Sequence, residues 1–507
     1  MKNLYQKFIY LIPSIIIFLI TLSVTLKYSW PIGWDIFYHI HLSKVYMANG
    51  LTFFDPIYNA PGTIINYPPV FHLAILVLGY VLRMDLFDVA RLMQPFLAAL
   101  VALSVTVVAS RLYEDKYAGI FAGLILFSGS IAMRLGSSLP ENMALIFLPL
   151  SIFFFYEFFK DDKIIASFIS GCLTGLVALI HPAATFCLVF AITFITAGLV
   201  ITEFYFERDT GVIKRALKGY AILIGTAGLI ASVWWLPAFY FKSLGHGGVA
   251  TSLSVSRSLS ILKYPDALGY FVLVLAVAGI IPAIRRFELR DRLILLWIIS
   301  MFILSKSYYF GINVITYRVL IYIMIPLTIL ASSGLISVVE AIKNKNKDIA
   351  RILLIALFIF AVFQAFNNLS SSKVADYGAM TAYGRINIAP PTDSEFELAK
   401  WFNSQNEDGK ISLSNYFTGG FVMAYTNRPV DSLLYEKSEI PSRDELTERE
   451  ISYLVFDKRL KASGDFKFNA SSSFLFYNPT RINISDLEYP YLQKIYENQD
   501  FVVYRVL

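Results

Sequence analysis

The feature that most constrains this chain is a series of long apolar runs separated by short basic clusters. Of its 507 residues, 56% are hydrophobic and only 16% are charged. In a soluble globular chain, about a quarter of the residues are charged. Runs of this length are typical of transmembrane helices rather than of a large water-soluble core. The sequence therefore predicts a polytopic α-helical membrane protein.

The net charge of +6 does not indicate a nucleic-acid partner. The basic residues stand at the ends of the apolar runs, where membrane proteins keep them. The two cysteines, Cys172 and Cys187, lie within apolar runs and are interpreted as small core residues. Neither a disulfide framework nor a Cys-rich metal site is expected.

Eleven apolar stretches are predicted to span the membrane. They cover residues 8–27, 89–110, 117–133, 143–159, 164–181, 183–202, 219–241, 267–284, 292–306, 314–338 and 350–367. The first is too long for a signal-peptide core and no clean cleavage site follows it, so it is interpreted as a retained span. A further stretch, 70–82, is short and flanked by polar residues.

The distribution of Lys and Arg decides whether 70–82 is a span, because these residues concentrate on the cytoplasmic side. With eleven spans and a cytoplasmic N-terminus, the outer loops hold fewer than half as many Lys and Arg as the inner ones. We therefore expect 70–82 to be an interfacial or re-entrant helix in a long first outer loop, 28–88. The chain is expected to be a multi-pass protein of the cell (plasma) membrane, with residues 370–507 outside the cytoplasm.

The tail, 370–507, is predicted to be a soluble extracytoplasmic α/β domain following a transmembrane domain, 1–369. Thr392 and Glu395 form a capping-box pattern before a helix. Strand-like runs follow at 411–415, 421–426, 452–456 and 473–477, and 492–506 has the pattern of a hairpin. The sequons at Asn469 and Asn483 fit the outer side, although such triplets also arise by chance.

The long first outer loop is the first candidate for chemistry. If 34–48 is helical, Asp35 and His39 share a face at i, i+4, and His41 points elsewhere. A carboxylate beside an imidazole can bind a divalent cation or take a proton from a hydroxyl. The alternative is that Asp35 only caps the helix and the aromatic residues form an interfacial belt. Tyr67, in Asn66-Tyr-Pro-Pro69, is a candidate for substrate binding.

Arg134 and Glu141 lie in the second outer loop, at the outer ends of spans. They can simply snorkel to the interface. They can also meet Asp35, since both loops are on one side. The two carboxylates Asp35 and Glu141 would then share a divalent cation such as Mg²⁺ or Mn²⁺, or one would orient what the other activates.

Three further positions are candidates for substrate binding. The loop 242–266 contains Gly245-His-Gly-Gly248, and with His246 it is either a lid over a substrate or a disordered connector. Arg318 lies just inside a span, where it either meets a lipid phosphate or snorkels. His181, before Pro182, is expected in a tight outer turn from which Pro182 starts the next helix.

The combined pattern resembles the GT-C superfamily of membrane glycosyltransferases, and within it the catalytic subunit of archaeal and eukaryotic oligosaccharyltransferases. Three segments carry the likeness: Trp34-Asp-Ile-Phe-Tyr-His-Ile-His-Leu42, Gly136-Ser-Ser-Leu-Pro-Glu-Asn-Met-Ala-Leu-Ile-Phe147, and Tyr317-Arg-Val-Leu. They resemble the family's first-loop Asp segment, its second acidic loop, and its late-span Arg that meets the lipid-linked donor.

The chain also departs from that family. Asn415-Tyr-Phe-Thr-Gly419 resembles the Trp-Trp-Asp-x-Gly signature that reads the acceptor sequon, but it lacks both Trp and the Asp. Leu139 stands where the family carries an Asp two residues before the Glu, which weakens the expectation of a metal site. These departures argue against an oligosaccharyltransferase.

The resemblance implies an inverting enzyme that takes one sugar from a dolichyl- or polyprenyl-phosphate donor, with Asp35 as general base. Arg318 and Arg134 would stabilise the leaving phosphate, and His39 would orient Asp35 or the acceptor. The acceptor would be a lipid-linked glycan, a membrane lipid or a protein. The alternatives are a diverged oligosaccharyltransferase and a non-catalytic protein that binds lipid-linked sugars. A transporter is less favoured, because no repeated halves and no Gly/Pro-broken helix pair are evident.

Overall fold

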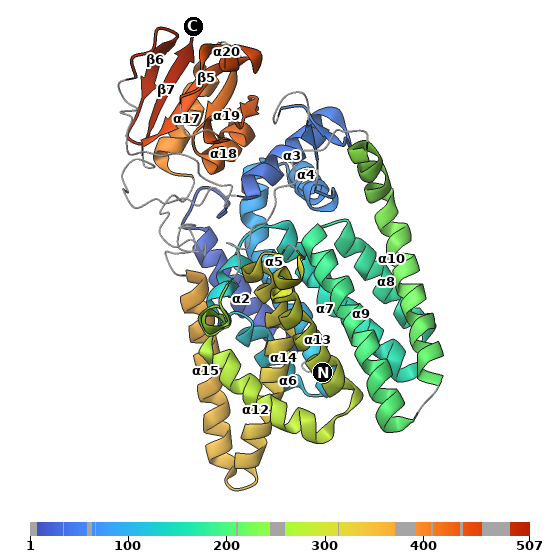
Figure 1. Ribbon diagram of the computed structural model, residues 1–507. Helices are drawn as coiled ribbons and strands as arrows, with labels where there is room; N and C mark the ends of the chain where they lie inside the picture. The colour runs from blue at the N-terminus through green and yellow to red at the C-terminus, as the bar shows by residue number, and fades with distance from the viewer. Residues whose placement is uncertain are drawn as a thin grey trace.

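The computed structural model describes residues 8–33, 35–57, 63–65, 67–208, 211–243, 259–312, 314–370, 391–406, 409–436, 440–458 and 487–507. A long helical bundle forms most of the molecule, and a small sheet-containing region lies at one end of it (Figure 1). The N-terminal side of the bundle begins with α2 (Ile12–Thr25), preceded by a short turn of helix, Ile9–Leu11.

Each of the eleven predicted spans coincides with a helix of the bundle. After α2 these helices are α5 (Leu86–Tyr113), α6 (Lys116–Ile125), α7 (Pro140–Asp161), α8 (Ile164–Ala178), α9 (Pro182–Thr202), α10 (Gly211–Ser243), α12 (Tyr270–Arg286), α13 (Leu289–Ser305), α14 (Thr316–Lys343) and α15 (Lys347–Ser370). Within the described residues, six helices are long and apolar enough to cross a membrane by themselves, and up to eight if each of two bent pairs is one span. The fold is that of a multi-pass membrane protein, as predicted.

Two of the spans are broken, contrary to the expectation that no broken helix pair exists. The α6 helix turns by 90° into the 3-10 helix η2 (Ser130–Gly136), and the helical segment Ile261–Leu268 turns by 102° into α12. The two breaks touch: a side chain on Gly129 would lie 2.5 Å from the carbonyl oxygen of Leu268. Gly269 has a φ of +88°, which glycine adopts readily. These contacts are invisible in the local pattern of apolar residues, which is why the sequence reading missed the breaks.

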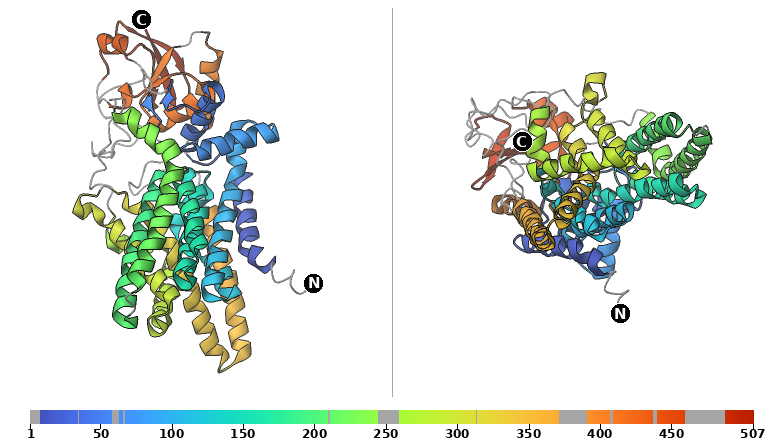
Figure 2. Two further views of the ribbon diagram at one scale, coloured as in Figure 1. Left: turned by 90° about the vertical axis from the view of Figure 1, so that its right-hand side faces the viewer. Right: turned by 90° about the horizontal axis from the view of Figure 1, so that it is seen from below.

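The first outer loop folds into a cap of two helices, α3 (Asp35–Asn49) and α4 (Val70–Leu82), with a short antiparallel pair β1 (Phe54–Asp55) and β2 (Thr63–Ile64) between them. Figure 2 shows α4 lying across the ends of the bundle helices rather than along them. This orientation agrees with the expectation that 70–82 is an interfacial helix and not a twelfth span.

The C-terminal region contains a five-stranded mixed sheet in the order β4-β3-β5-β7-β6. The strands are β3 (Lys410–Leu413), β4 (Val430–Asp431), β5 (Ile451–Asp457), β6 (Leu492–Glu497) and β7 (Phe501–Val506), and β3 pairs in parallel with both β4 and β5. Four helices accompany it: α17 (Asp393–Ser404), α18 (Tyr416–Thr426), α19 (Leu433–Glu436) and α20 (Arg443–Glu448). The predicted capping box, the β3 and β5 strands and the hairpin of β6 and β7 are confirmed.

One predicted strand of this region is wrong. Residues 421–426 belong to α18, and the side chains from Phe421 to Ala424 are all buried. A short run that is apolar on every side has no period that separates a strand from a buried helix. The predicted strand 473–477 and both sequons lie outside the described residues.

The sheet-containing region packs directly on the cap. Phe37 of α3 contacts Phe421 of α18, with 5.2 Å between ring centroids. The Lys44 ammonium group donates to the carbonyl oxygen of Ala424 at 2.7 Å. A shared apolar cluster joins residues of α3, α4 and α5 to residues of α17, α18 and the sheet. The cap is therefore held from both sides, and its first turn, which carries Asp35, is fixed against the bundle.

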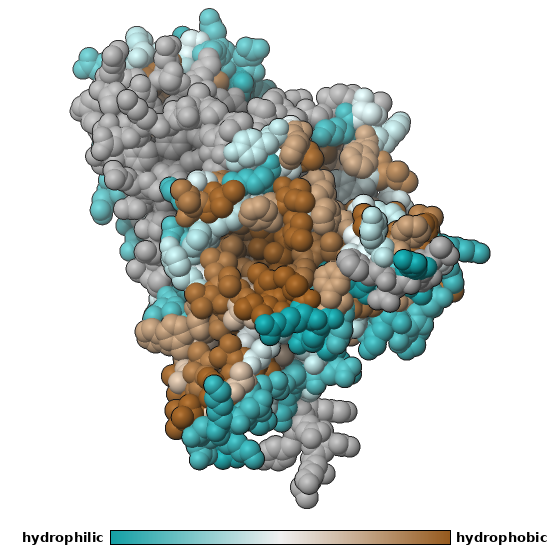
Figure 3. Space-filling model, turned by 60° about the horizontal axis from the view of Figure 1, so that its bottom comes forward, coloured by the Kyte–Doolittle hydropathy of each residue, from teal (hydrophilic) through white to brown (hydrophobic). Residues whose placement is uncertain are grey.

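The lateral surface of the bundle, around its long axis, is apolar. Figure 3 shows apolar side chains gathered over a hollowed face of the bundle, with polar side chains toward the end below it. Exposed apolar side chains also follow α12 and α15, for example Val274, Val277, Ile281, Ile355 and Ile359. Such a surface suits contact with lipid chains, which agrees with the membrane assignment.

Candidate active site

Four charged side chains from three separate parts of the chain meet at the end of the bundle that carries the cap. A guanidinium nitrogen of Arg134 lies 3.7 Å from Asp35 Oδ2, and one of Arg318 lies 3.9 Å from the same oxygen. The Arg134 Nε–H group donates to Glu141 Oε2 at 2.6 Å. The sequence reading predicted all four residues for the site, and the structure brings them together.

The two carboxylates of the cluster, Asp35 and Glu141, differ in how far they are buried. The Asp35 side chain is 44% exposed, whereas that of Glu141 is 1% exposed. Both oxygens of Glu141 already accept hydrogen bonds, one from Arg134 and the other from the Tyr322 hydroxyl at 3.0 Å. The Glu141 carboxylate is thus held in place by Arg134 and Tyr322, and its predicted catalytic role stays a prediction. Asp35 remains accessible to a substrate.

The local fold explains why Arg134 points at Glu141. The break after α6 turns the η2 segment across the bundle, and Pro140 then starts α7 at a position where its missing N–H is no loss. The Asn142 amide donates to the carbonyl oxygens of Arg134 and Ser137, at 2.8 and 2.6 Å, and so closes the turn between the two segments. Glu141 falls in the first turn of α7, where the helix dipole favours a negative charge.

Gln94 of α5 ties the two outer loops to each other, and the sequence reading missed it. Its side-chain oxygen accepts from the Ile32 backbone N–H at 3.2 Å, and its amide donates to the Gly136 carbonyl oxygen at 3.1 Å. Ile32 stands three residues before Asp35, and Gly136 two residues after Arg134. In the sequence, Gln94 stands out as an amide side chain inside an apolar run, directly before Pro95, and this could have marked it as a buried hydrogen-bonding residue.

If this site carries the sugar transfer that the resemblance implies, replacing Gln94 by leucine should lower its rate by about 10- to 100-fold, because a displacement of about 1 Å in a site costs up to about 100-fold. The change leaves two buried backbone groups without partners, each costing about 1–3 kcal/mol. The measurement is the initial rate of transfer in proteoliposomes. Gln364→Leu, at a partly exposed position of α15, is the matched control, and equal rates for both variants would contradict the role given to Gln94.

Tyr322 is the second residue that the sequence reading missed. It lies four residues after Arg318 on α14, so the two side chains share one helix face. Through its bond to Glu141, α14 holds the second outer loop at the same point where it presents Arg318 to Asp35. The i, i+4 spacing of an Arg and a Tyr inside an apolar span was the signal for this pairing.

His39, Tyr67 and His181 form a layer of rings beside the charged cluster. The centroids of His39 and Tyr67 are 4.8 Å apart, and those of Tyr67 and His181 are 6.3 Å apart. Burial raises the pKa of the Tyr67 phenol above its ordinary value. Burial, and after it the neighbouring His181, lowers the pKa of His39 to about 3, so His39 is neutral at pH 7.

Each of the described histidines has a partner other than Asp35. His39 Nδ1 lies 2.9 Å from His72 Nε2, so this nitrogen is engaged with α4, and the role of His39 in orienting Asp35 or the acceptor stays a prediction. His41 points elsewhere, as predicted, and pairs with Asp55 at 2.8 Å. His181 caps α9, where its ring accepts from the Ala184 N–H. His246 and its Gly-rich loop lie outside the described residues.

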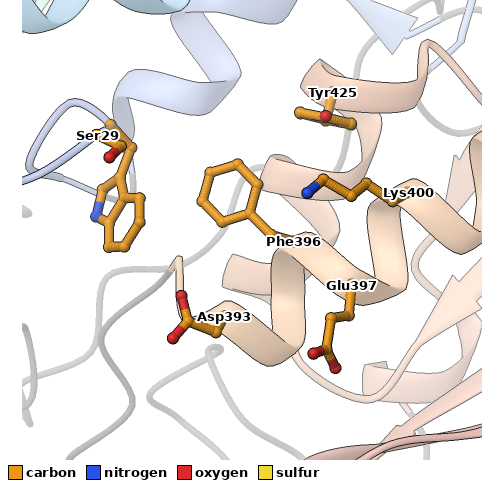
Figure 4. Close-up of a pocket in the computed structure, with 7 residues that line it drawn as sticks. Ser29, Asp393, Phe396, Glu397, Lys400 and Tyr425 are labelled. Carbon is orange, nitrogen blue, oxygen red and sulfur yellow. The ribbon is translucent and has the colours of Figure 1, made fainter.

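A pocket of about 400 Å³ lies between the start of the first outer loop and the C-terminal region. It is lined by Ser29, Trp30, Asp393, Phe396, Glu397, Lys400 and Tyr425. Figure 4 shows Lys400 near Tyr425 and, at the other side of Phe396, the carboxylates of Asp393 and Glu397. Aromatic faces next to charged groups suit a ligand that carries both C–H faces and hydroxyl groups.

The fold is shared with known membrane glycosyltransferases. In shape the chain resembles the oligosaccharyltransferase of Archaeoglobus fulgidus (TM-score 0.62, 15% identity, 90% of this chain and 70% of that one). It also resembles ArnT from Cupriavidus metallidurans bound to undecaprenyl phosphate (TM-score 0.58, 13% identity, 98% and 97%). A third likeness is to the mycobacterial arabinofuranosyltransferase AftD (TM-score 0.55, 14% identity), of which the chain covers 40%. The fold is that of the GT-C membrane glycosyltransferases.

Within this superfamily the likeness to oligosaccharyltransferases also appears in the sequence. The family model described as the N-terminal part of the oligosaccharyl transferase STT3 matches residues 29–264. That stretch includes Asp35, Arg134 and Glu141, whereas Arg318 lies beyond it. No curated protein sequence matches the chain. The chain thus has the GT-C fold, and residues 29–264 resemble the N-terminal part of an oligosaccharyl transferase catalytic subunit.

Proposed function

We propose that this protein transfers a sugar from a dolichyl- or polyprenyl-phosphate donor to a hydroxyl acceptor at the outer face of the cell membrane. The observation that carries the proposal is the exposed carboxylate of Asp35 within 4 Å of two arginines, Arg134 and Arg318. An accessible carboxylate can remove the proton of the acceptor hydroxyl, and arginines held beside it can stabilise the phosphate that leaves.

The chemistry needs one base and one site for the leaving anion. The acceptor O–H gives its proton to Asp35, and the acceptor oxygen attacks the anomeric carbon of the donor sugar. The bond from this carbon to the phosphate oxygen breaks, and the lipid phosphate departs with the electron pair. Because the phosphate needs no proton to leave, Arg318 stabilises it through charge and hydrogen bonds alone. Attack opposite the phosphate inverts the anomeric configuration.

Two observations support a lipid-phosphate donor. Arg318 is one third exposed at the start of α14, and the bundle to which α14 belongs carries exposed apolar side chains that suit contact with a polyprenyl chain. Among the similar structures, an Archaeoglobus fulgidus oligosaccharyltransferase is in complex with a dolichol-phosphate, and ArnT is bound to undecaprenyl phosphate. The distribution of Lys and Arg predicts that the tail lies on this same outer side, and α18 of the tail packs on α3.

The proposal is tested by mass spectrometry of glycolipids and surface glycans from a strain that lacks this chain. We expect one sugar residue to be missing from one class of glycan, and its return when the intact chain is supplied. An unchanged glycan profile, together with donor-lipid binding and no turnover by the purified chain, would instead support a non-catalytic binding protein.

A diverged oligosaccharyltransferase is the second candidate, because the STT3 family model matches the chain. The tail argues against it. In the segment that resembles the sequon-reading signature, Asn415 is buried and donates to Asp457 at 2.8 Å, while Thr418 is buried and donates to Glu395 at 2.6 Å. Both side chains are buried and hydrogen-bond to residues of the same region, so they stabilise the fold of the tail. Formation of a glycopeptide from a sequon peptide and a lipid-linked oligosaccharide would favour the second candidate.

A further inference from the structure

Arg134 occupies the space between the two carboxylates that were expected to share a metal ion. Its guanidinium group is within 4 Å of Asp35 and hydrogen-bonded to Glu141 at 2.6 Å. The side chain is only 17% exposed, so its charge is held in place rather than mobile in solvent. A guanidinium group stays protonated at every pH that a protein survives.

The residues present do not fit a divalent cation at this point. Ca²⁺ and Mg²⁺ take six or more oxygen ligands, and Zn²⁺ takes four from oxygen, nitrogen and sulfur. Over the described parts of the chain, no group of three or more His, Cys, Asp or Glu side chains could hold a metal ion. Both oxygens of Glu141 are engaged by donors. A metal ion here would also have to sit beside a fixed positive charge, which repels it.

We infer that Arg134 is the built-in cation of this site, so that sugar transfer by this chain needs no divalent metal ion. The inference rests on the proposed function, and it assigns Arg134 a positioning role toward Asp35. The charges agree: Arg134 and Arg318 balance Asp35 and Glu141, so the cluster is neutral before the donor arrives. The Tyr322 and Asn142 bonds then hold Arg134 and its turn rigid, which makes the charge preorganised.

The first test is on the intact chain. Treatment with EDTA should leave the transfer rate within about twofold of its untreated value. Titration of the purified chain with Mn²⁺, followed by electron paramagnetic resonance, should show no bound ion that a Glu141→Gln variant loses. A drop of tenfold or more with EDTA that Mn²⁺ or Mg²⁺ reverses would overturn the inference, as would a bound Mn²⁺ that Glu141→Gln abolishes.

The second test changes the charge. Arg134→Lys keeps a cation and should retain transfer to within about tenfold. Arg134→Gln removes it and should lose 100-fold or more, and we expect Mn²⁺ to restore part of this loss in the Gln variant alone. Wild-type rates for Arg134→Gln would overturn the inference. Arg351→Gln, on an exposed side chain near the start of α15, is the matched control.

The proposed function and the inference that transfer needs no divalent metal ion are contradicted by different results. If the chain transfers no sugar, the proposed function fails, but the Mn²⁺ titration still decides whether Glu141 and Asp35 form a metal site. If transfer occurs and depends on a metal ion, the function stands and the inference falls.

Discussion

Replacing Asp35 by asparagine should lower the rate of sugar transfer by about 10²- to 10⁴-fold, the range that a positioned general base contributes. Asparagine has nearly the same shape but cannot accept the proton of the acceptor hydroxyl. Because the Asp35 side chain is 44% exposed, the loss of its ion pairs should cost little folding free energy. The expected phenotype is a folded protein that binds the donor and does not turn it over.

The measurement pairs transfer with binding. Initial rates are taken in proteoliposomes with a polyprenyl-phosphate sugar, and donor affinity is taken by titration of the same preparation. Asp348→Asn, on a side chain that is 85% exposed at the start of α15, is the control and should behave as the intact chain does. Retention of more than half of the rate by Asp35→Asn would exclude Asp35 as the base.

Some of this site was readable from the sequence because each residue carried a local signal. Asp35 and Glu141 are carboxylates at the boundary of apolar runs, and Arg318 is a charge inside one, so each is costly unless it has a partner. The eleven apolar runs located all the helices of the bundle. The exclusion of 70–82 came from counting Lys and Arg, and the crosswise α4 agrees with it.

Other parts depend on contacts between distant segments, for which one sequence holds no local signal. At the break after α6, Gly129 lies against the backbone of Leu268, 139 residues away in sequence. Glu141 and Tyr322 meet across 181 residues. His39 shares a helix face with Asp35, yet its partner is His72 of α4. The run 421–426 shows no period because its first four side chains, Phe421 to Ala424, are all buried. Such features need the tertiary packing to be known.

Arg318 is the residue whose replacement should have the second-largest effect. Changing it to glutamine removes the charge that we propose faces the leaving phosphate, and the loss of one such donor typically costs about 10²- to 10³-fold in turnover. Lysine should restore part of the rate, since it keeps the charge but loses the fork of N–H groups that matches a phosphate.

If the leaving group is a lipid phosphate, Arg318→Gln must also weaken inhibition by free polyprenyl phosphate, by about tenfold or more, because the product and the leaving group bind the same arginine. Arg318 also lies 3.9 Å from Asp35, so a double variant with Asp35→Asn should be little worse than Asp35→Asn alone. Unchanged inhibition by polyprenyl phosphate in Arg318→Gln would place the donor phosphate elsewhere and leave Arg318 as a partner of Asp35 only.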